Sequence, residues 1–268
     1  MAGPLLGAAA LMSGQAWALL AVLFGLGMQA TFFGPLKYGI LPQHLRPGEL
    51  LAGNALVEAA TFAAILLGTI LGGVLIAGPH GPKLVGCVVV AVAAVGLVAA
   101  WAVPAAAAAA PGLAIGWNSV AGAIGLLRAA RAEPEVWRAS LGISWFWAFG
   151  ATYLAVFAPL VRDVFGGGND VVTLLLAGFA LGIGAGSIAA GRLAGGRIET
   201  RHLAAAAAAM TVLTLGFALL CTAGAARGWS SVGGMLTSPS GLLAWLCLLG
   251  TAMAGGVFSL PLYATIQQ

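Results

Sequence analysis

Seven long apolar runs constrain this chain more than any other feature of its sequence. A helix needs about 20 consecutive apolar residues to cross the hydrocarbon core of a bilayer. The runs are Trp17–Pro35, Leu50–Ala77, Leu84–Val103, about 140–161, Val171–Ala190, Leu203–Cys221 and Leu242–Ile266. The sequence therefore predicts an all-α membrane protein with seven complete spans.

The composition agrees with a membrane protein and argues against other classes. Hydrophobic residues make up 61% of the chain and charged residues only 7%, against about 25% charged residues in a typical soluble domain. The eleven basic residues are scattered between apolar runs and form no basic face, so we expect no nucleic-acid partner. The three cysteines lie within apolar runs at no zinc or disulfide spacing, so we expect neither a metal nor another cofactor.

The basic residues predict which side of the membrane each loop faces. Assigning the loops alternately to two sides gives eight Lys and Arg on one side and three on the other, out of eleven. The first set is Lys37, Arg46, Arg128, Arg131, Arg138, Arg192, Arg197 and Arg201, and the second is Lys83, Arg162 and Arg227. Because Lys and Arg accumulate in cytoplasmic loops, the first set is predicted to be cytoplasmic.

The polar stretch at residues 107–138 divides the runs into two groups. It contains Trp117, Asn118 and several charged residues, and we interpret it as a cytoplasmic linker, partly helical on the membrane surface. Residues 1–106 would then belong to an N-terminal helix bundle and residues 139–268 to a C-terminal one. Residues 5–12 are apolar but too short to span, so we interpret them as the tail of a helix whose beginning is absent.

Glu58 is the strongest functional candidate, because a carboxylate inside an apolar run is costly in a bilayer. Asn54 precedes it by one helical turn and so lies on the same face. Two interpretations are open for Glu58. It is either a structural hydrogen-bonding group between helices, or a carboxylate that lines a polar cavity and contacts substrate or couples to protons.

Lys37 stands at the end of the first complete span and also has two interpretations. It is either a snorkelling anchor that meets the dipole at the helix C-terminus, or a cation that binds an anionic headgroup or pairs with Glu58. We assign Gly68, Gly72, Gly191, Arg192 and Arg197 to close helix packing and a tight cytoplasmic turn, because small residues four apart let helix backbones approach. The run Gly182–Gly186 looks like a dinucleotide fingerprint, but it lies inside a span and predicts close helix packing instead.

Several segments resemble one family of transporters. They are Gly34–Pro42 (GPLKYGILP), Asn54–Glu58 (NALVE), Ile65–Gly73 (ILLGTILGG), Ser144–Trp147 (SWFW), and Pro261–Tyr263 with Gln267. These segments resemble the lysophospholipid transporter branch of the major facilitator superfamily. The sequence of these segments is more similar to the transporter half that is fused to an acyltransferase and an acyl-carrier-protein ligase.

The resemblance implies a major-facilitator-type helical bundle of twelve helices, in two halves joined by a cytoplasmic linker. On that map residues 5–12 end helix 3, the complete spans are helices 4 to 10, and 107–138 is the central linker. We therefore expect a partial bundle of about helices 3–10, with the remaining helices missing.

The resemblance also implies a function, namely movement of lysophospholipids across the bacterial inner membrane for phospholipid repair. The implied partners are a lysophospholipid or other amphipathic solute, membrane lipid, and an acyltransferase encoded in cis or nearby. Two alternatives remain, a facilitator for another small amphipath and an inactive truncated fragment. With the fused enzyme domains absent, we do not expect an enzyme.

The expected site serves the polar headgroup, because the acyl chain can stay in apolar surroundings. Lys37 suits the phosphate as a point charge, and Glu58 can meet an amine or hold Lys37 when the site is empty. Gln29, Tyr38 and Asn54 complete the predicted substrate-binding set as neutral polar groups.

Overall fold

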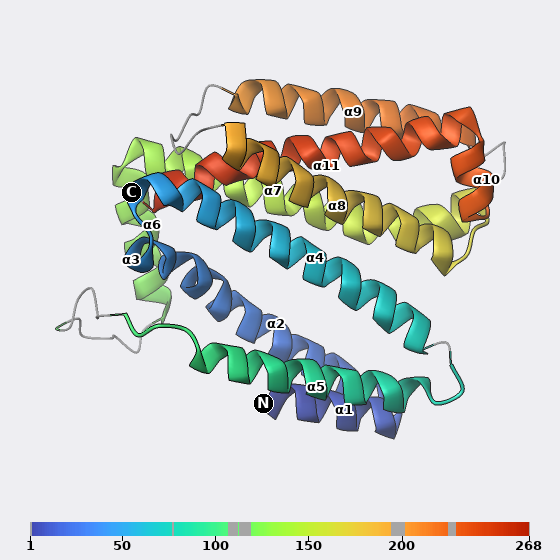
Figure 1. Cartoon of the computed structure of the whole chain (residues 1–268), viewed down its shortest axis with the longest axis horizontal. Coiled ribbons are helices and arrows are strands. Elements are labelled where there is room, and N and C mark those ends of the chain that lie inside the picture. Colours follow the sequence, from blue (N-terminus) through green and yellow to red (C-terminus); the bar gives the residue numbers. More distant parts are fainter. Residues whose placement is uncertain are drawn as a thin grey trace. The chain divides into compact units, whose positions relative to one another are not determined.

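The computed structural model describes residues 2–76, 78–106, 112, 119–193, 202–224 and 229–267. Within these residues all regular secondary structure is helical (Figure 1). The helices are α1 (Ala2–Ser13), α2 (Ala16–Gly39), α3 (Leu41–His44), the 3-10 helix η1 (Pro47–Glu49), α4 (Leu50–Ile76), α5 (Gly81–Trp101), α6 (Ser119–Ala132), α7 (Pro134–Pro159), the π-helix η2 (Leu160–Phe165), α8 (Asn169–Leu193), α9 (Leu203–Gly224), α10 (Val232–Thr237) and α11 (Pro239–Ile266).

Seven helical segments of the described chain are long and apolar enough to cross a membrane. They are α2 with α3, η1 with α4, α5, α7 with η2, α8, α9 and α11. The prediction of an all-α membrane protein with seven spans is therefore confirmed. The short apolar segment near the N-terminus forms α1, which has 12 residues.

Capping side chains and glycines set where several helices begin and end. The Ser231 side chain accepts the backbone N–H of Gly234 in α10 at 3.1 Å, and the Ser238 side chain accepts that of Gly241 in α11 at 3.0 Å. Both serines therefore act as N-cap residues. Gly166 ends η2 with φ of 64°, a left-handed conformation that glycine adopts readily. The Glu49 carboxylate accepts the Arg46 backbone N–H at 2.9 Å, so Glu49 has a structural partner at the start of α4.

Helix boundaries differ most from the predicted ones at two places. The fourth span was expected to begin near residue 140, but α7 begins at Pro134, because proline fits the first helical turn and Glu135 favours the positive helix N-terminus. Residues 223–240 separate the last two predicted spans, yet they contain α10 and the start of α11. Glycines and serines suggested a loop here, and the two serine caps explain the short helix instead.

Packing divides the chain into two units. The first comprises Met1–His44 with Gly68–Pro111, and the second comprises Leu45–Leu67 with Gly112–Gln268. The part of α4 up to Leu67 therefore belongs to the second unit. The chain up to His44 and the rest of α4 belong to the first unit. The division into two bundles at a 107–138 linker stays a prediction.

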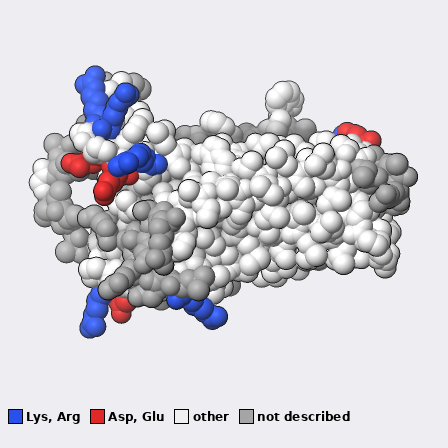
Figure 2. Space-filling model, turned by 90° about the horizontal axis from the view of Figure 1, so that it is seen from above, with Lys and Arg blue, Asp and Glu red and all other residues white. Residues whose placement is uncertain are grey.

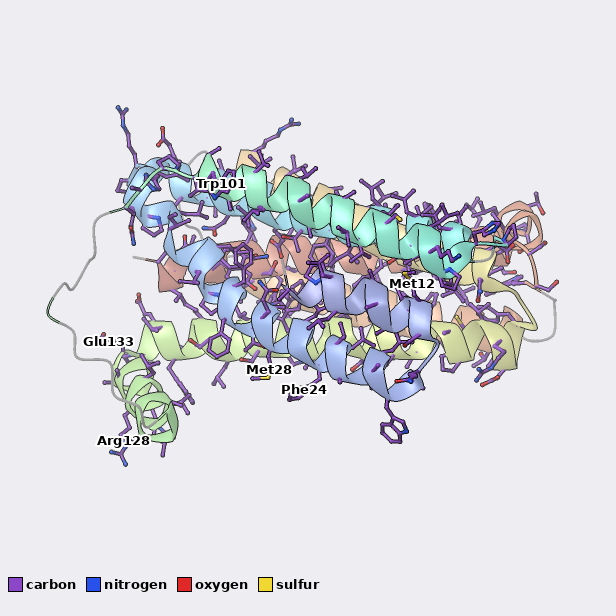
Figure 3. All side chains as sticks on the ribbon, turned by 90° about the horizontal axis from the view of Figure 1, so that it is seen from below. Met12, Phe24, Met28, Trp101, Arg128 and Glu133 are labelled. Atoms are coloured by element: carbon purple, nitrogen blue, oxygen red, sulfur yellow. The ribbon has the colours of Figure 1, made fainter. Side chains whose placement is uncertain are left out.

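In the first unit α1 packs against both α2 and α5. A Cβ on Gly86 would lie 3.2 Å from the Ala8 side chain, so small residues set the approach of α5 to α1. Large apolar side chains elsewhere in this unit are exposed, including Met12, Phe24, Met28 and Trp101 (Figure 3). Exposed apolar side chains along a span are what a lipid environment requires.

α11 is the central helix of the second unit, and α7, α8, α9 and α10 all pack against it. Its buried face includes Leu248 and Ala252, which join a core with Phe157 and Phe179 from α7 and α8. A second, smaller cluster joins Leu51 and Ala55 of α4 to Leu260 and Ala264 of α11. This second cluster is where the polar residues of α4 come to lie.

Candidate functional site

Glu58 lies buried among the helices of the second unit, with 2% of its surface exposed. Its Oε1 accepts the Ser259 hydroxyl of α11 at 2.7 Å, and its Oε2 accepts the Ser187 hydroxyl of α8 at 2.9 Å. Each carboxylate oxygen therefore receives a hydroxyl from a different helix. Hydrogen bonds to a carboxylate offset part of its cost of burial.

Glycines bring the two serines to one carboxylate. A Cβ on Gly256 of α11 would lie 2.6 Å from the Ser187 backbone nitrogen, which is closer than any real side chain could approach. A Cβ on Gly186 would overlap the Met253 carbonyl, and one on Gly182 would lie 2.5 Å from the Leu249 carbonyl oxygen. The interpretation of Gly182–Gly186 as close helix packing is thus confirmed, and the close approach sets the positions of both hydroxyls.

Asn54 and Gln267 form a reciprocal pair of side-chain amides one turn away. The Asn54 Nδ2 donates to Gln267 Oε1 at 2.6 Å, and Gln267 Nε2 donates to Asn54 Oδ1 at 2.9 Å. Asn54 Nδ2 also donates to the Leu50 carbonyl oxygen at 3.0 Å. The polar groups of α4 therefore tie its first half to the last turns of α11.

The structure places the remaining predicted substrate-binding residues in the first unit. Lys37 and Tyr38 lie in the last turn of α2, and the Lys37 ammonium is 5.0 Å from the centroid of the Tyr38 ring. A cation at that distance from an aromatic face is attracted by it. Gln29 lines a cavity of about 860 Å³ between α1 and α2. The pairing of Lys37 with Glu58 stays a prediction.

The predicted packing residues have different surroundings. Gly191 lies in α8 against α4, where its Cβ would be 3.1 Å from the Ala55 side chain. Arg192 is exposed in the last turn of α8. A Cβ added at Gly68 or Gly72 would have no described heavy atom within 4 Å. Arg197 lies outside the described residues.

Two residues of the site, Ser187 and Ser259, were missed from the sequence, and Gln267 was named there only in a segment that resembles the transporter family. Serine inside a span is a weak signal, because its hydroxyl can bond a carbonyl of its own helix, as Ser144 does with Ser140 at 2.8 Å. Ser259 and Gln267 are eight residues apart on α11, which is a helical spacing. That spacing could have flagged them as partners for Asn54 and Glu58, but many apolar helices carry such pairs.

One face of α7 carries a row of aromatic rings, which the sequence indicated only as a cluster near Trp145. Ring centroids are 5.3 Å apart for Trp145 and Phe149, 5.0 Å for Phe149 and Tyr153, and 5.6 Å for Tyr153 and Phe157. The Tyr153 hydroxyl donates to Thr214 Oγ1 on α9 at 2.9 Å. Phe149, Tyr153 and Phe157 of this row line one wall of an apolar groove between α7 and α9.

Contacts within the second unit show which helix ends lie on the same side of the bundle. The Asn54–Gln267 pair puts the start of α4 beside the end of α11 (Figure 1). Gly191 against Ala55 adds the end of α8, and Gly142 against Leu262 adds the start of α7.

Most basic residues that the structure describes in the second unit lie on this side of the bundle. Arg46, Arg138 and Arg192 stand on the helix ends that lie together, and α6 with its two arginines packs against α7. At the other end of α7, Arg162 is paired with Asp163 at 2.7 Å. Figure 2 shows Lys, Arg, Asp and Glu toward the two ends of one face and other residues over the stretch between them. This asymmetry supports the predicted orientation, which itself stays a prediction.

The chain matches a known family. The model of the Major Facilitator Superfamily matches residues 1–268 of the chain. No curated protein and no solved structure matches it.

Proposed function

The chain belongs to the major facilitator superfamily, a family of membrane transporters, and on that premise we propose that it moves lysophospholipids across the bacterial inner membrane. The observation that carries the proposal is the carboxylate of Glu58, buried between three membrane-spanning helices. Ionisable groups at such depth mark substrate or ion pathways more often than packing. The choice of a lysophospholipid rests on the resemblance of residues 34–73 to that branch of transporters.

The chemistry of a lysophospholipid fits the two kinds of surface on these helices. Its single acyl chain needs only apolar surroundings, while its phosphate and its amine or hydroxyl need polar partners. Lys37 can neutralise the phosphate, and Gln29 and Tyr38 on the same helix can add hydrogen bonds. Membrane lipid and an acyltransferase that re-acylates the delivered substrate are the partners we propose.

The two serines position Glu58 in this proposal. Each carboxylate oxygen accepts one serine hydroxyl and keeps further acceptor capacity, so a headgroup amine can donate to Glu58 while the serines hold the carboxylate in place. The Asn54–Gln267 pair keeps α4 in place beside it.

Uptake by proteoliposomes that contain the chain tests the proposal. Lysophosphatidylethanolamine labelled in its headgroup should accumulate in the lumenal leaflet, and a single-chain alkyl amine without a phosphate should not compete. Glu58→Gln and Lys37→Ala should each abolish uptake at normal insertion levels, while Lys37→Arg should retain part of it.

The exposed Arg128 of α6 serves as the matched control, because Arg128→Gln removes a charge from outside the proposed site. Transport of lysophosphatidylethanolamine at wild-type rates by both Glu58→Gln and Lys37→Ala would place the headgroup site elsewhere. Equal competition by the alkyl amine would show that the protein carries another amphipath.

A further inference from the structure

A groove of about 450 Å³ lies between α7 and α9 in the second unit. Its lining runs from Phe149 to Val164 along α7 and from Thr214 to Thr222 along α9. Both walls belong to helical segments long and apolar enough to cross a membrane, so the groove lies at the depth of the lipid acyl chains.

The groove is apolar even though hydroxyl groups line it. Thr152 donates to the carbonyl of Ala148 at 2.9 Å, and Thr222 donates to the carbonyl of Leu219 at 2.7 Å. The Tyr153 hydroxyl donates to Thr214. Because these donor protons are committed to protein acceptors, the lining favours a ligand that needs no hydrogen bonds, such as a hydrocarbon chain.

The size of the groove suits one acyl chain. If a methylene takes up about the volume of one water molecule, about 30 Å³, then a groove of about 450 Å³ holds about fifteen carbons. That is the length of one common fatty-acyl chain, whereas a diacyl lipid would have to leave its second chain outside.

The position of the groove along the helices assigns it to one leaflet. The segment Pro134–Phe165 spans the membrane, and Phe149 stands at its middle. From there to Val164 the helix rises roughly 20 Å, which exceeds the roughly 15 Å of one hydrocarbon leaflet and so reaches its headgroups. The groove residues of α9 likewise lie in its second half.

The headgroup end of this leaflet is the end that carries Arg162 and Asp163. Both side chains are exposed and paired with each other at 2.7 Å. A positive and a negative group at this level match the phosphate and the amine of a zwitterionic headgroup. On the predicted orientation, this leaflet faces away from the cytoplasm, which is where imported lysophospholipid must start.

We infer that the α7–α9 groove is a loading site that holds the acyl chain of a lysophospholipid drawn from the outer leaflet. The inference rests on the proposed function for the identity of the lipid. The chain end lies near Phe149 at the bilayer centre, and the headgroup lies at the level of Arg162. Loading from the side of the protein precedes contact of the headgroup with the polar site on α4.

Photo-crosslinking in proteoliposomes tests the groove directly. Lysophosphatidylethanolamine with a diazirine at the end of its acyl chain should label peptides of α7 and α9 near Phe149 and Thr214. The same lipid with the diazirine on its headgroup should label the segment around Arg162. In detergent micelles, where no diacyl bilayer competes, a tenfold excess of diacylphosphatidylethanolamine, an amount on the order of one decade in occupancy, should leave this labelling largely unchanged.

Two neighbouring residues of α9 give a matched pair of variants. Ala218 lines the groove, whereas Leu219 is exposed outside it. Ala218→Trp should fill the groove with its indole ring and lower labelling by the acyl probe about tenfold or more. Leu219→Trp adds its ring to the lipid-facing surface and should label like the wild type.

The outcomes separate this inference from the proposed function. If the wild type transports lysophospholipid but the acyl probe labels other helices, or Ala218→Trp labels normally, the groove is not the loading site. If diacyl lipid competes equally, the groove binds bilayer lipid in general and the inference is overturned. If the groove is labelled while no lysophospholipid is transported, the loading site stands and the proposed function fails.

Discussion

Removing the two hydroxyls that bond Glu58 should show how much the buried carboxylate depends on them. Ser259→Ala and Ser187→Ala each delete one donor, at 2.7 and 2.9 Å from the carboxylate oxygens, without changing helix propensity unfavourably. Both serines are fully buried. No water can therefore easily replace a deleted hydroxyl, and each loss is felt in full.

The magnitude depends on the charge of Glu58. Hydrogen bonds between neutral groups of membrane helices average about 0.6 kcal/mol and reach about 1.7 kcal/mol, whereas bonds to a charged group contribute about 1.5–3 kcal/mol. For an ionised Glu58, the two serine variants should each lower the free energy of unfolding by about 2 kcal/mol. The double variant should cost more than the sum, because it leaves a buried carboxylate without either hydroxyl.

The assay is reversible unfolding of the purified protein in mixed micelles, followed by circular dichroism, with a double-mutant cycle over both serines. Ser144→Ala is the control, because Ser144 is a serine of a spanning helix whose hydroxyl bonds its own helix. It should change the free energy of unfolding by less than about 0.5 kcal/mol. Losses below about 0.5 kcal/mol for both Ser187→Ala and Ser259→Ala would refute the reasoning that hydroxyls hold the carboxylate.

Three further predictions concern packing and orientation. Gly186→Ala should destabilise the protein by about 1–3 kcal/mol in the same unfolding assay, because its Cβ would overlap a carbonyl of α11. Gly150→Ala is the control and should be neutral or stabilising, because a Cβ there would have no described neighbour within 4 Å. Asn54→Leu should cost about 1–3 kcal/mol, because it removes both hydrogen bonds between the Asn54 and Gln267 amides, and an unchanged melting temperature would contradict this. In a cysteine-free background, Arg162→Cys should react with an impermeant maleimide added outside spheroplasts and Arg131→Cys should not, and the reverse pattern would invert the topology.

The seven spans could be predicted from the sequence because hydropathy acts locally. In a bilayer, backbone groups must bond within each segment, so a long apolar run specifies a helix whatever its neighbours are. Loop residues escape this rule, and α10 was missed because a serine cap and one turn of helix outweighed the glycines around it. The helical start at Pro134 shows the same limit at a span boundary.

The sequence also identified Asn54 and Glu58, since a polar residue in an apolar run stands out by itself. It could not identify Ser187, Ser259 or Gln267 as their partners, because these distances along the chain exceed a hundred residues and depend on how α8 and α11 cross.

Only the tertiary structure decided that crossing. The glycines of α8 and α11 let the two backbones approach so closely that a Cβ would not fit between them. This approach brings the Ser187 and Ser259 hydroxyls to the buried Glu58 carboxylate. A sequence records the glycines and serines separately, and the spacing that unites them exists only after the helices have packed.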